Sequence, residues 1–172
     1  TGGFNSNGDA FANWFFKRAT GFMDVVAYTG DGSTSRAINH NLGVEPELLI
    51  TKCRNSASNW LAFYDFRGTV CSRFLLQTTT AANTSINYTG SQMKADPTDS
   101  VFTVGSNSNV NTNANTYIAY LFATLAGVSK VGSYTGTGNN VDVDCGFSAG
   151  ARFILIKRSD STGDWYVWDS ER

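Results

Sequence analysis

The sequence predicts an all-β protein, an antiparallel β-sandwich of the jelly-roll or lectin-like type, built from a tandem repeat of about 105 residues. Three observations predict this fold. Short apolar and aromatic runs of about four to eight residues alternate with clusters of Gly, Asn, Ser and Thr, as is typical of strands joined by turns. Only 16% of the residues are charged and 41% are hydrophobic, which suits two packed sheets. Finally, residues 1–66 resemble residues 107–172.

Ten segments are expected to be strands, and we expect no helix. The strands are residues 10–17, 23–29, 46–53, 59–64, 73–77, 101–105, 116–123, 130–134, 152–157 and 165–169. In the segment 116–123, Ile118, Tyr120 and Phe122 share one face, whereas Tyr117 and Leu121 share the other. Because both faces are apolar, this strand is predicted to lie inside a packed structure.

The internal repeat sets the predicted domain organisation. Phe11 and Phe16 fall opposite Tyr117 and Phe122 at an offset of 106 positions, and Asn59-Trp60 fall opposite Asp164-Trp165 at an offset of 105. We therefore expect residues 1–21 to end a preceding repeat, 22–127 to form one complete β-sandwich repeat, and 128–172 to start the next. The two partial copies can alternatively pair into a single sandwich. The chain is interpreted as a window from a longer array.

The matching turns Thr29-Gly30-Asp31-Gly32 and Thr135-Gly136-Thr137-Gly138 each place two glycines where a positive φ is expected. A phosphate-binding loop would need a following helix and usually a Lys, which are not found here.

Composition excludes several function classes. The formal net charge of -1 gives no basic field for nucleic acid, and no apolar run approaches the roughly 20 residues that cross a bilayer. We therefore expect neither nucleic acid nor a membrane as a partner. The three cysteines lack metal-ligand or disulfide spacing and are interpreted as small buried thiols. The single histidine, His40, falls opposite Cys145, which excludes a histidine-dependent site remade in each repeat; a solvated loop or strand-end position is expected.

Several long motifs carry a family resemblance. They are GVSKVGSYTG at 127–136, CGFSAGARF at 145–153, LIKR at 155–158 followed by GDWYVWD at 163–169, and VFTVG at 101–105 with YIAYLFA at 117–123. Together they resemble a repeat domain of unknown function found in bacteriophage virion proteins, mostly of the tail or tail-fibre type. The resemblance implies a structural domain of the virion, assembled in the bacterial host cytoplasm, with other virion proteins as partners. By analogy with phage fibres it also implies a homo-oligomer, a trimer. It carries over no catalytic or binding residue.

Aromatic rings beside polar side chains indicate a ligand surface. The candidates are Asn59, Trp60, Tyr64, Asp164, Trp165 and Trp168. Sugar rings stack on flat aromatics while amides and carboxylates hydrogen-bond the hydroxyls, so a host surface glycan is the expected ligand. The competing interpretation is that these rings are core anchors on alternating strand faces. Basic residues at strand ends, Lys52, Arg54, Lys157 and Arg158, are either solvated edge charges or a grip on anionic polysaccharide.

We expect that the protein is not an enzyme and that it needs no cofactor. A polysaccharide depolymerase, kept as an alternative, would need a pair of carboxylates such as two of Asp65, Asp164, Asp169 and Glu171. Calcium is a second open alternative, with Asp31, Asn139, Asn140, Asp142 and Asp144 as ligands, although ordinary turns use the same residues. The sequence thus predicts a virion domain of a tail fibre or similar appendage that binds host glycan; a capsid decoration or a purely structural spacer is the further alternative.

Overall fold

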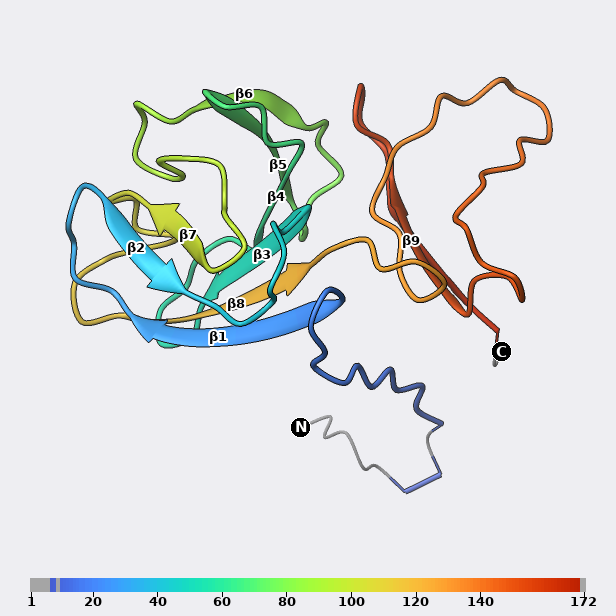
Figure 1. Cartoon of the computed structure of the whole chain (residues 1–172), viewed down its shortest axis with the longest axis horizontal. Coiled ribbons are helices and arrows are strands. Elements are labelled where there is room, and N and C mark those ends of the chain that lie inside the picture. Colours follow the sequence, from blue (N-terminus) through green and yellow to red (C-terminus); the bar gives the residue numbers. More distant parts are fainter. Residues whose placement is uncertain (1–6, 9, 171–172) are drawn as a thin grey trace.

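The computed structural model describes residues 7–8 and 10–170, and within these ranges it contains strands and no helix (Figure 1). The strands are β1 (Met23–Thr29), β2 (Arg36–Asn39), β3 (Leu48–Cys53), β4 (Leu61–Tyr64), β5 (Val70–Leu75), β6 (Asn83–Asn87), β7 (Val101–Val104), β8 (Thr116–Phe122), β9 (Phe153–Lys157) and β10 (Trp165–Asp169). All named pairs are antiparallel. The all-β, antiparallel prediction is confirmed. No helix of the described residues is long and apolar enough to span a membrane.

One six-stranded sheet, ordered β1-β8-β3-β4-β5-β6, forms the body of the molecule. β8 lies between β1 and β3 and pairs with both over its whole length or nearly so. Its residues Tyr117, Ala119 and Leu121 are fully buried, and the residues between them are half-buried. The expectation that this strand lies inside a packed structure is confirmed.

A second layer, the β2–β7 sheet, covers one face of the six-stranded sheet (Figure 1). The core between them contains Leu49, Leu61 and Phe63 from the large sheet and Ile38 and Phe102 from the small one. Burying each such side chain contributes about 1.5–3 kcal/mol, so this layer contact dominates the stability of the body. Two antiparallel layers around one core are consistent with a β-sandwich. We call the opposite face of the six-stranded sheet the outer face.

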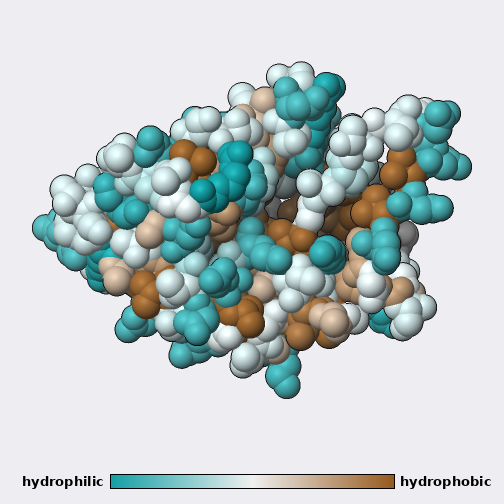
Figure 2. Space-filling model, turned by 45° about the horizontal axis from the view of Figure 1, so that its top comes forward, coloured by the Kyte–Doolittle hydropathy of each residue, from teal (hydrophilic) through white to brown (hydrophobic). Residues whose placement is uncertain are grey.

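β9 and β10 form a separate two-stranded sheet, the β9–β10 hairpin, beside the body (Figure 1). Its register places Phe153 opposite Asp169, just as Leu48 lies opposite Tyr64 in the β3–β4 hairpin 105 positions earlier. The hairpin turns its Trp165 side toward the outer face, where the indole meets the Phe74 ring edge-on at 5.3 Å. Hydrophobic surface gathers around the hollow where the hairpin meets the body (Figure 2).

Two predicted strands are absent from the structure, two observed strands were not predicted, and the strand predicted at 73–77 lies at Val70–Leu75. Residues 10–17 and 130–134 form no strand, and neither segment is paired with a strand of the described sheets. Two short strands, β2 and β6, were not predicted. Each contains a single large aliphatic residue, Ile38 in β2 and Ile86 in β6, so neither has the apolar pattern of a buried strand. Backbone pairing with β7 and β5, and not an apolar pattern, defines them.

His40 is buried, 5% exposed, so the solvated position predicted for it is wrong, although it does follow the end of β2. Its Nδ1 accepts a hydrogen bond from the Leu42 backbone N–H at 3.2 Å, and its Nε2 lies 3.1 Å from the Thr98 carbonyl oxygen. Since a carbonyl can only accept, Nε2 carries the proton and the ring is neutral. Burial lowers the pKa of His40 below its ordinary value of 6.5, against the opposing effect of the Thr98 hydrogen bond.

The prediction that both glycines of each glycine-rich turn have a positive φ is wrong. Gly32 and Gly138 have φ of 70° and 79°, whereas Gly30 and Gly136 are not among the residues with positive φ. Position 30 requires glycine for another reason: the Thr112 backbone lies so close that a Cβ there would be 2.1 Å from its carbonyl oxygen.

Two of the three cysteines are small buried thiols, as predicted. Cys53 and Cys71 are buried and Cys145 is partly buried, and all three are free. Burial raises the pKa of Cys71 to about 12, so this thiol stays protonated near neutral pH.

Candidate functional site

The strand register arranges the outer face in rows. Trp60 immediately precedes β4, and the β3–β4 register places it across from Lys52. The next row contains Tyr120, Ile50, Ala62 and Phe74, each from a different strand. These side chains point away from the core, so the outer face is itself apolar and aromatic.

Trp60 is the exposed aromatic of this face, with 36% of its surface accessible. Its ring stacks on that of Tyr120 with centroids 6.5 Å apart and an interplanar angle of 23°. Its backbone N–H donates to Gln77 Oε1 at 3.2 Å, and its carbonyl accepts from the Leu76 N–H. The ring is therefore held in place by neighbours on β8 and after β5 while remaining accessible to a ligand.

Amide side chains form a chain along the margin of Trp60. Gln77 Nε2 donates to Asn59 Oδ1 at 2.6 Å, and the Asn59 backbone N–H donates to Asn109 Oδ1 at 3.0 Å. Asn109 in turn donates through Nδ2 to Asn107 Oδ1 at 3.0 Å. Amides both donate and accept, so this margin offers the groups that hydroxyl-rich ligands require.

Lys52 places a positive charge at the same margin. Its Nζ donates to the Ser58 carbonyl at 2.9 Å and to Ser58 Oγ at 3.0 Å. We call Lys52, Asn59, Trp60, Gln77 and Tyr120 the Trp60 surface. Chemically, it combines a flat ring, fixed amides and one ammonium group.

Tyr64 and Trp165, two other predicted ligand residues, instead pack against Phe74. Tyr64 stacks on Phe74 at 4.9 Å and 8°, and burial raises the pKa of its hydroxyl. The indole Nε1 of Trp165 is buried without a hydrogen-bond partner among the described residues. Lys157 also lies over the Phe74 ring at 5.6 Å. These residues join the β9–β10 hairpin to the body, so the core-anchor interpretation applies to them.

Trp168 and Asp164 lie elsewhere on the β9–β10 hairpin. Trp168 is 52% exposed and stacks on Tyr166 at 5.5 Å and 16°. By strand alternation, this pair lies on the face of the hairpin opposite to Trp165. Asp164 is exposed just before β10. The structure therefore brings Asn59 and Trp60 together, and Tyr64 and Trp165 together, but does not gather the six predicted residues into one site.

The carboxylates predicted for a depolymerase have separate partners. Asp65 accepts from Ser72 Oγ at 3.1 Å and lies 3.3 Å from Arg67 Nε, whereas Asp169 accepts from Trp14 Nε1 at 3.2 Å. Asp164 is exposed before β10, and Glu171 lies outside the described residues. Among the described residues, no two of these carboxylates face each other across a cleft.

Among the predicted calcium ligands, Asp31 is bound by protein groups. Its Oδ1 accepts from Asn111 Nδ2 at 3.0 Å and from the Ser33 N–H at 2.9 Å, while Oδ2 lies 3.5 Å from Arg36 Nε. Hydrogen bonds from Ser33, with those from Asn111, lower the pKa of Asp31 to about 2. Within residues 7–8 and 10–170, no group of three or more His, Cys, Asp or Glu side chains is placed to hold a metal ion. Calcium binding remains a prediction.

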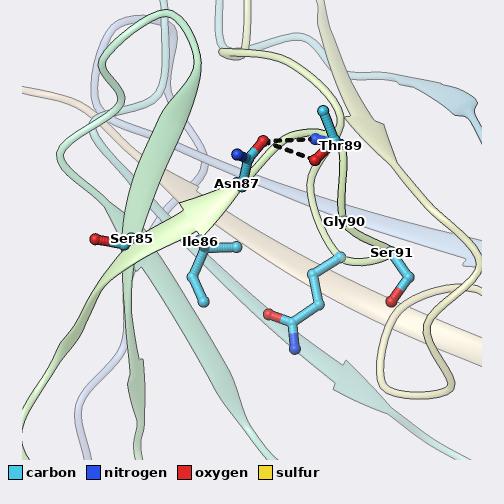
Figure 3. A pocket seen from close by; sticks show the side chains of 7 residues that line it. Ser85, Ile86, Asn87, Thr89, Gly90 and Ser91 are labelled. Carbon is cyan, nitrogen blue, oxygen red and sulfur yellow. Dashed lines mark hydrogen bonds between the residues drawn. The ribbon is translucent and has the colours of Figure 1, made fainter.

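A polar hollow follows β6, and sequence reasoning did not find it. Its volume is about 290 Å³, and its lining includes Asn87, Thr89, Ser91 and Gln92 (Figure 3). Asn87 Oδ1 accepts from both the N–H and the hydroxyl of Thr89, at 2.8 and 3.0 Å. Gln92 Oε1 is buried without a hydrogen-bond partner among the described residues. The sequence there contains only ordinary turn residues, which give no signal for a hollow.

Comparisons with known proteins define the family and leave the activity open. Neither a curated protein nor a solved structure matches the chain. One family profile matches residues 1–172, which is the whole chain. The protein therefore belongs to the family described as domain of unknown function (DUF7483).

Proposed function

We propose that this chain is a non-enzymatic domain of a bacteriophage virion appendage of the tail-fibre type, and that it binds host surface glycan through the Trp60 surface. The observation that carries the binding proposal is the accessible Trp60 ring, stacked on Tyr120 and bordered by fixed amides. The virion assignment is supported by the resemblance of the long motifs at 127–136 and 145–169 to phage virion repeats.

The placement of Trp60 favours a ligand role over a packing role. Trp60 lies on the outer face of the six-stranded sheet, and the core lies on the opposite face, which β2 and β7 cover. The Trp60 ring is therefore not part of the core of the body. Trp168 differs, because it occupies the position that Phe63 occupies in the β3–β4 hairpin, where the side chain is fully buried. Trp168 is exposed because no second sheet among the described residues covers that face of the β9–β10 hairpin.

The tandem repeat forms part of the proposal. It is supported by the identical register of the β3–β4 and β9–β10 hairpins at an offset of 105 positions. A single ring and a few amides bind a sugar weakly. Repeats in one chain, and several chains in a homo-oligomer such as a trimer, raise the avidity of weak sites when the geometry allows simultaneous contact.

A spacer or capsid decoration is the second candidate function. The observation that favours it is the extent of exposed apolar surface on the β9–β10 hairpin, where Ile154, Leu155, Val167 and Trp168 are all at least 39% exposed. Such surface suits contact with another protein better than contact with a sugar.

Binding to an array of bacterial surface polysaccharides tests the proposal. We expect the wild-type chain to bind at least one polysaccharide, and Trp60→Ala to weaken that binding by about tenfold or more while the melting temperature stays close to wild type. Trp168→Ala is the matched control. It removes an equally large exposed ring from the β9–β10 hairpin, away from the Trp60 surface, and this variant should bind as wild type. Equal binding by Trp60→Ala and wild type would contradict the glycan proposal, and new reducing ends after incubation would indicate a depolymerase.

A further inference from the structure

The strands of the six-stranded sheet place one charged side chain on the outer face, that of Lys52. The register puts every second residue of β1, β3, β4, β5 and β8 on this face, and apart from Lys52 these residues are apolar, aromatic or hydroxyl-bearing. Asp24 of β1 and Arg73 of β5 lie on the opposite face, and β6 contains no charged residue. The positive charge of Lys52 is therefore isolated on the face that also presents Trp60.

Lys52 makes no ion pair with a carboxylate of the described residues. The four ion pairs that these residues form all use arginines. Asp65, the acidic residue that follows β4, lies at the far end of that strand, about 16 Å from Trp60 at the usual rise per residue. It is itself paired with Arg67. No internal carboxylate of this sheet therefore neutralises the Lys52 ammonium group.

The Lys52 ammonium group is nevertheless held in place. It donates to both the carbonyl and the hydroxyl of Ser58, at 2.9 and 3.0 Å. An ammonium group has three N–H donors, so one donor remains for a ligand. A lysine that only covers apolar surface with its stem would keep its head mobile in solvent. A fixed head loses less side-chain entropy when a ligand binds, which suits a binding role.

The register also fixes how far this charge lies from the Trp60 ring. Lys52 lies across from Trp60, and the Cβ atoms of facing residues in antiparallel strands are about 5 Å apart. In a hexuronic acid the carboxylate is attached directly to a carbon of the sugar ring. When such a ring stacks on an indole, its carboxylate lies at the edge of the stacked rings, within reach of the neighbouring residue. The spacing of Lys52 and Trp60 therefore matches an acidic sugar.

We propose that the ligand of the Trp60 surface is an acidic polysaccharide, in which one sugar stacks on Trp60 and its ring carboxylate forms an ion pair with Lys52. This inference rests on the proposed glycan function and adds the class of sugar. The amides of Asn59 and Gln77 then bind hydroxyl groups of the same chain of sugars. A charge-assisted hydrogen bond is stronger than a neutral one, so the carboxylate contributes to specificity as well as affinity.

Carboxyl reduction of the ligand, combined with a Lys52 variant, tests the proposal. Each acidic bacterial polysaccharide is arrayed in its native form and in a form whose carboxylates have been reduced to primary alcohols, which leaves the linkages unchanged. We expect the wild type to bind a native acidic polysaccharide and to bind its reduced form at least about tenfold more weakly. Lys52→Gln should lose about tenfold on the native form and nothing further on the reduced form.

Lys130→Gln is the matched control, because it removes the same charge from an exposed lysine outside the six-stranded sheet. It should bind as wild type, and the melting temperatures of both glutamine variants should stay close to that of the wild type. An equal loss for Lys130→Gln and Lys52→Gln would contradict the proposal, because net charge alone would then explain the binding.

Two further results separate this inference from the proposed function. Equal binding of native and reduced forms, or unchanged binding by Lys52→Gln, would overturn the acidic-sugar inference alone if Trp60→Ala still weakens binding. Absence of binding to every polysaccharide, or wild-type binding by Trp60→Ala, would contradict the proposed glycan function and this inference with it.

Discussion

The β3–β4 and β9–β10 hairpins have the same register and opposite surroundings. In the first, Leu49 and Phe63 are fully buried beneath the β2–β7 layer; at the corresponding positions of the second, Ile154 and Trp168 are 39% and 52% exposed. Alternating apolar residues therefore suffice to pair two strands. They do not bury the pair, because burial needs flanking strands and a second layer.

The other faces of the two hairpins differ less. On the β3–β4 hairpin the outer face is partly covered, and on the β9–β10 hairpin the corresponding face packs Trp165 and Phe153 against Phe74 and Phe16. The two hairpins thus turn the same face toward each other, and the core-type face of the β9–β10 hairpin points away from the body. This arrangement explains why exposed aromatic residues concentrate there.

The largest expected effect comes from truncating equivalent rings in the two hairpins. Phe63→Ala should lower the free energy of unfolding by about 3–5 kcal/mol, because it leaves a cavity in the core. Trp168→Ala should lower it by less than about 1 kcal/mol, since half of that ring is already in solvent. Urea unfolding followed by circular dichroism measures both. Similar losses for the two variants would mean that the hairpins are equally buried.

A smaller contrast is expected between the equivalent turns. Gly30→Ala should cost about 1–3 kcal/mol, because the new methyl group would lie 2.1 Å from the Thr112 carbonyl oxygen and the backbone would have to move. Gly136→Ala has nothing within 4 Å of the added Cβ and should stay within about 0.5 kcal/mol of wild type. Thermal unfolding of the two variants compares them directly, and an equal cost would show that the turn after β8 is as closely packed as the turn after β1.

The smallest expected effect is the pH dependence that comes from His40, which the second copy lacks because Cys145 stands at the equivalent position. The pKa of His40 is lowered in the folded state, so the unfolded chain binds more protons as the pH falls through 6.5, and stability decreases. The nearby Asp24 also has a lowered pKa, although burial alone would raise it, because the Asn41 and Val25 N–H groups and Arg18 favour its charged form; its contribution is lost only below about pH 4.

His40→Asn keeps an acceptor for the Leu42 N–H and removes the titration. Between pH 7 and about pH 5 its unfolding free energy should change less than that of the wild type. Urea unfolding at a series of pH values measures the two slopes. Identical slopes would show that His40 is not held neutral by the fold.

The sequence predicted correctly those strands that have an apolar pattern and also pair with a neighbouring strand in the structure. The bounds of β1 and β10 were predicted without error, and the interior position of β8 followed from its two apolar faces. It failed at residues 10–17, which have the β8 pattern, because a pattern cannot show whether a sheet edge is present. It also missed β6, a polar edge strand defined by its pairing with β5.

The candidate site was predictable in part. Asn59 and Trp60 were identified from the aromatic and polar residues at the start of β4, and the structure keeps them together. Gln77 and Tyr120 were missed, because they reach the surface from other strands and only the long-range register places them there. Tyr64 and Trp165 have the same local pattern as Trp60, and only tertiary packing on Phe74 distinguishes them.

Hydrogen exchange of the two hairpins tests the central claim most directly. At a concentration where the chain is monomeric, backbone amides of β3 and β4 should exchange only through global unfolding, whereas those of β9 and β10 should exchange through local opening and be faster by orders of magnitude. Equal protection of the two hairpins would contradict the claim that flanking strands and a second layer, and not the strand pattern, decide burial.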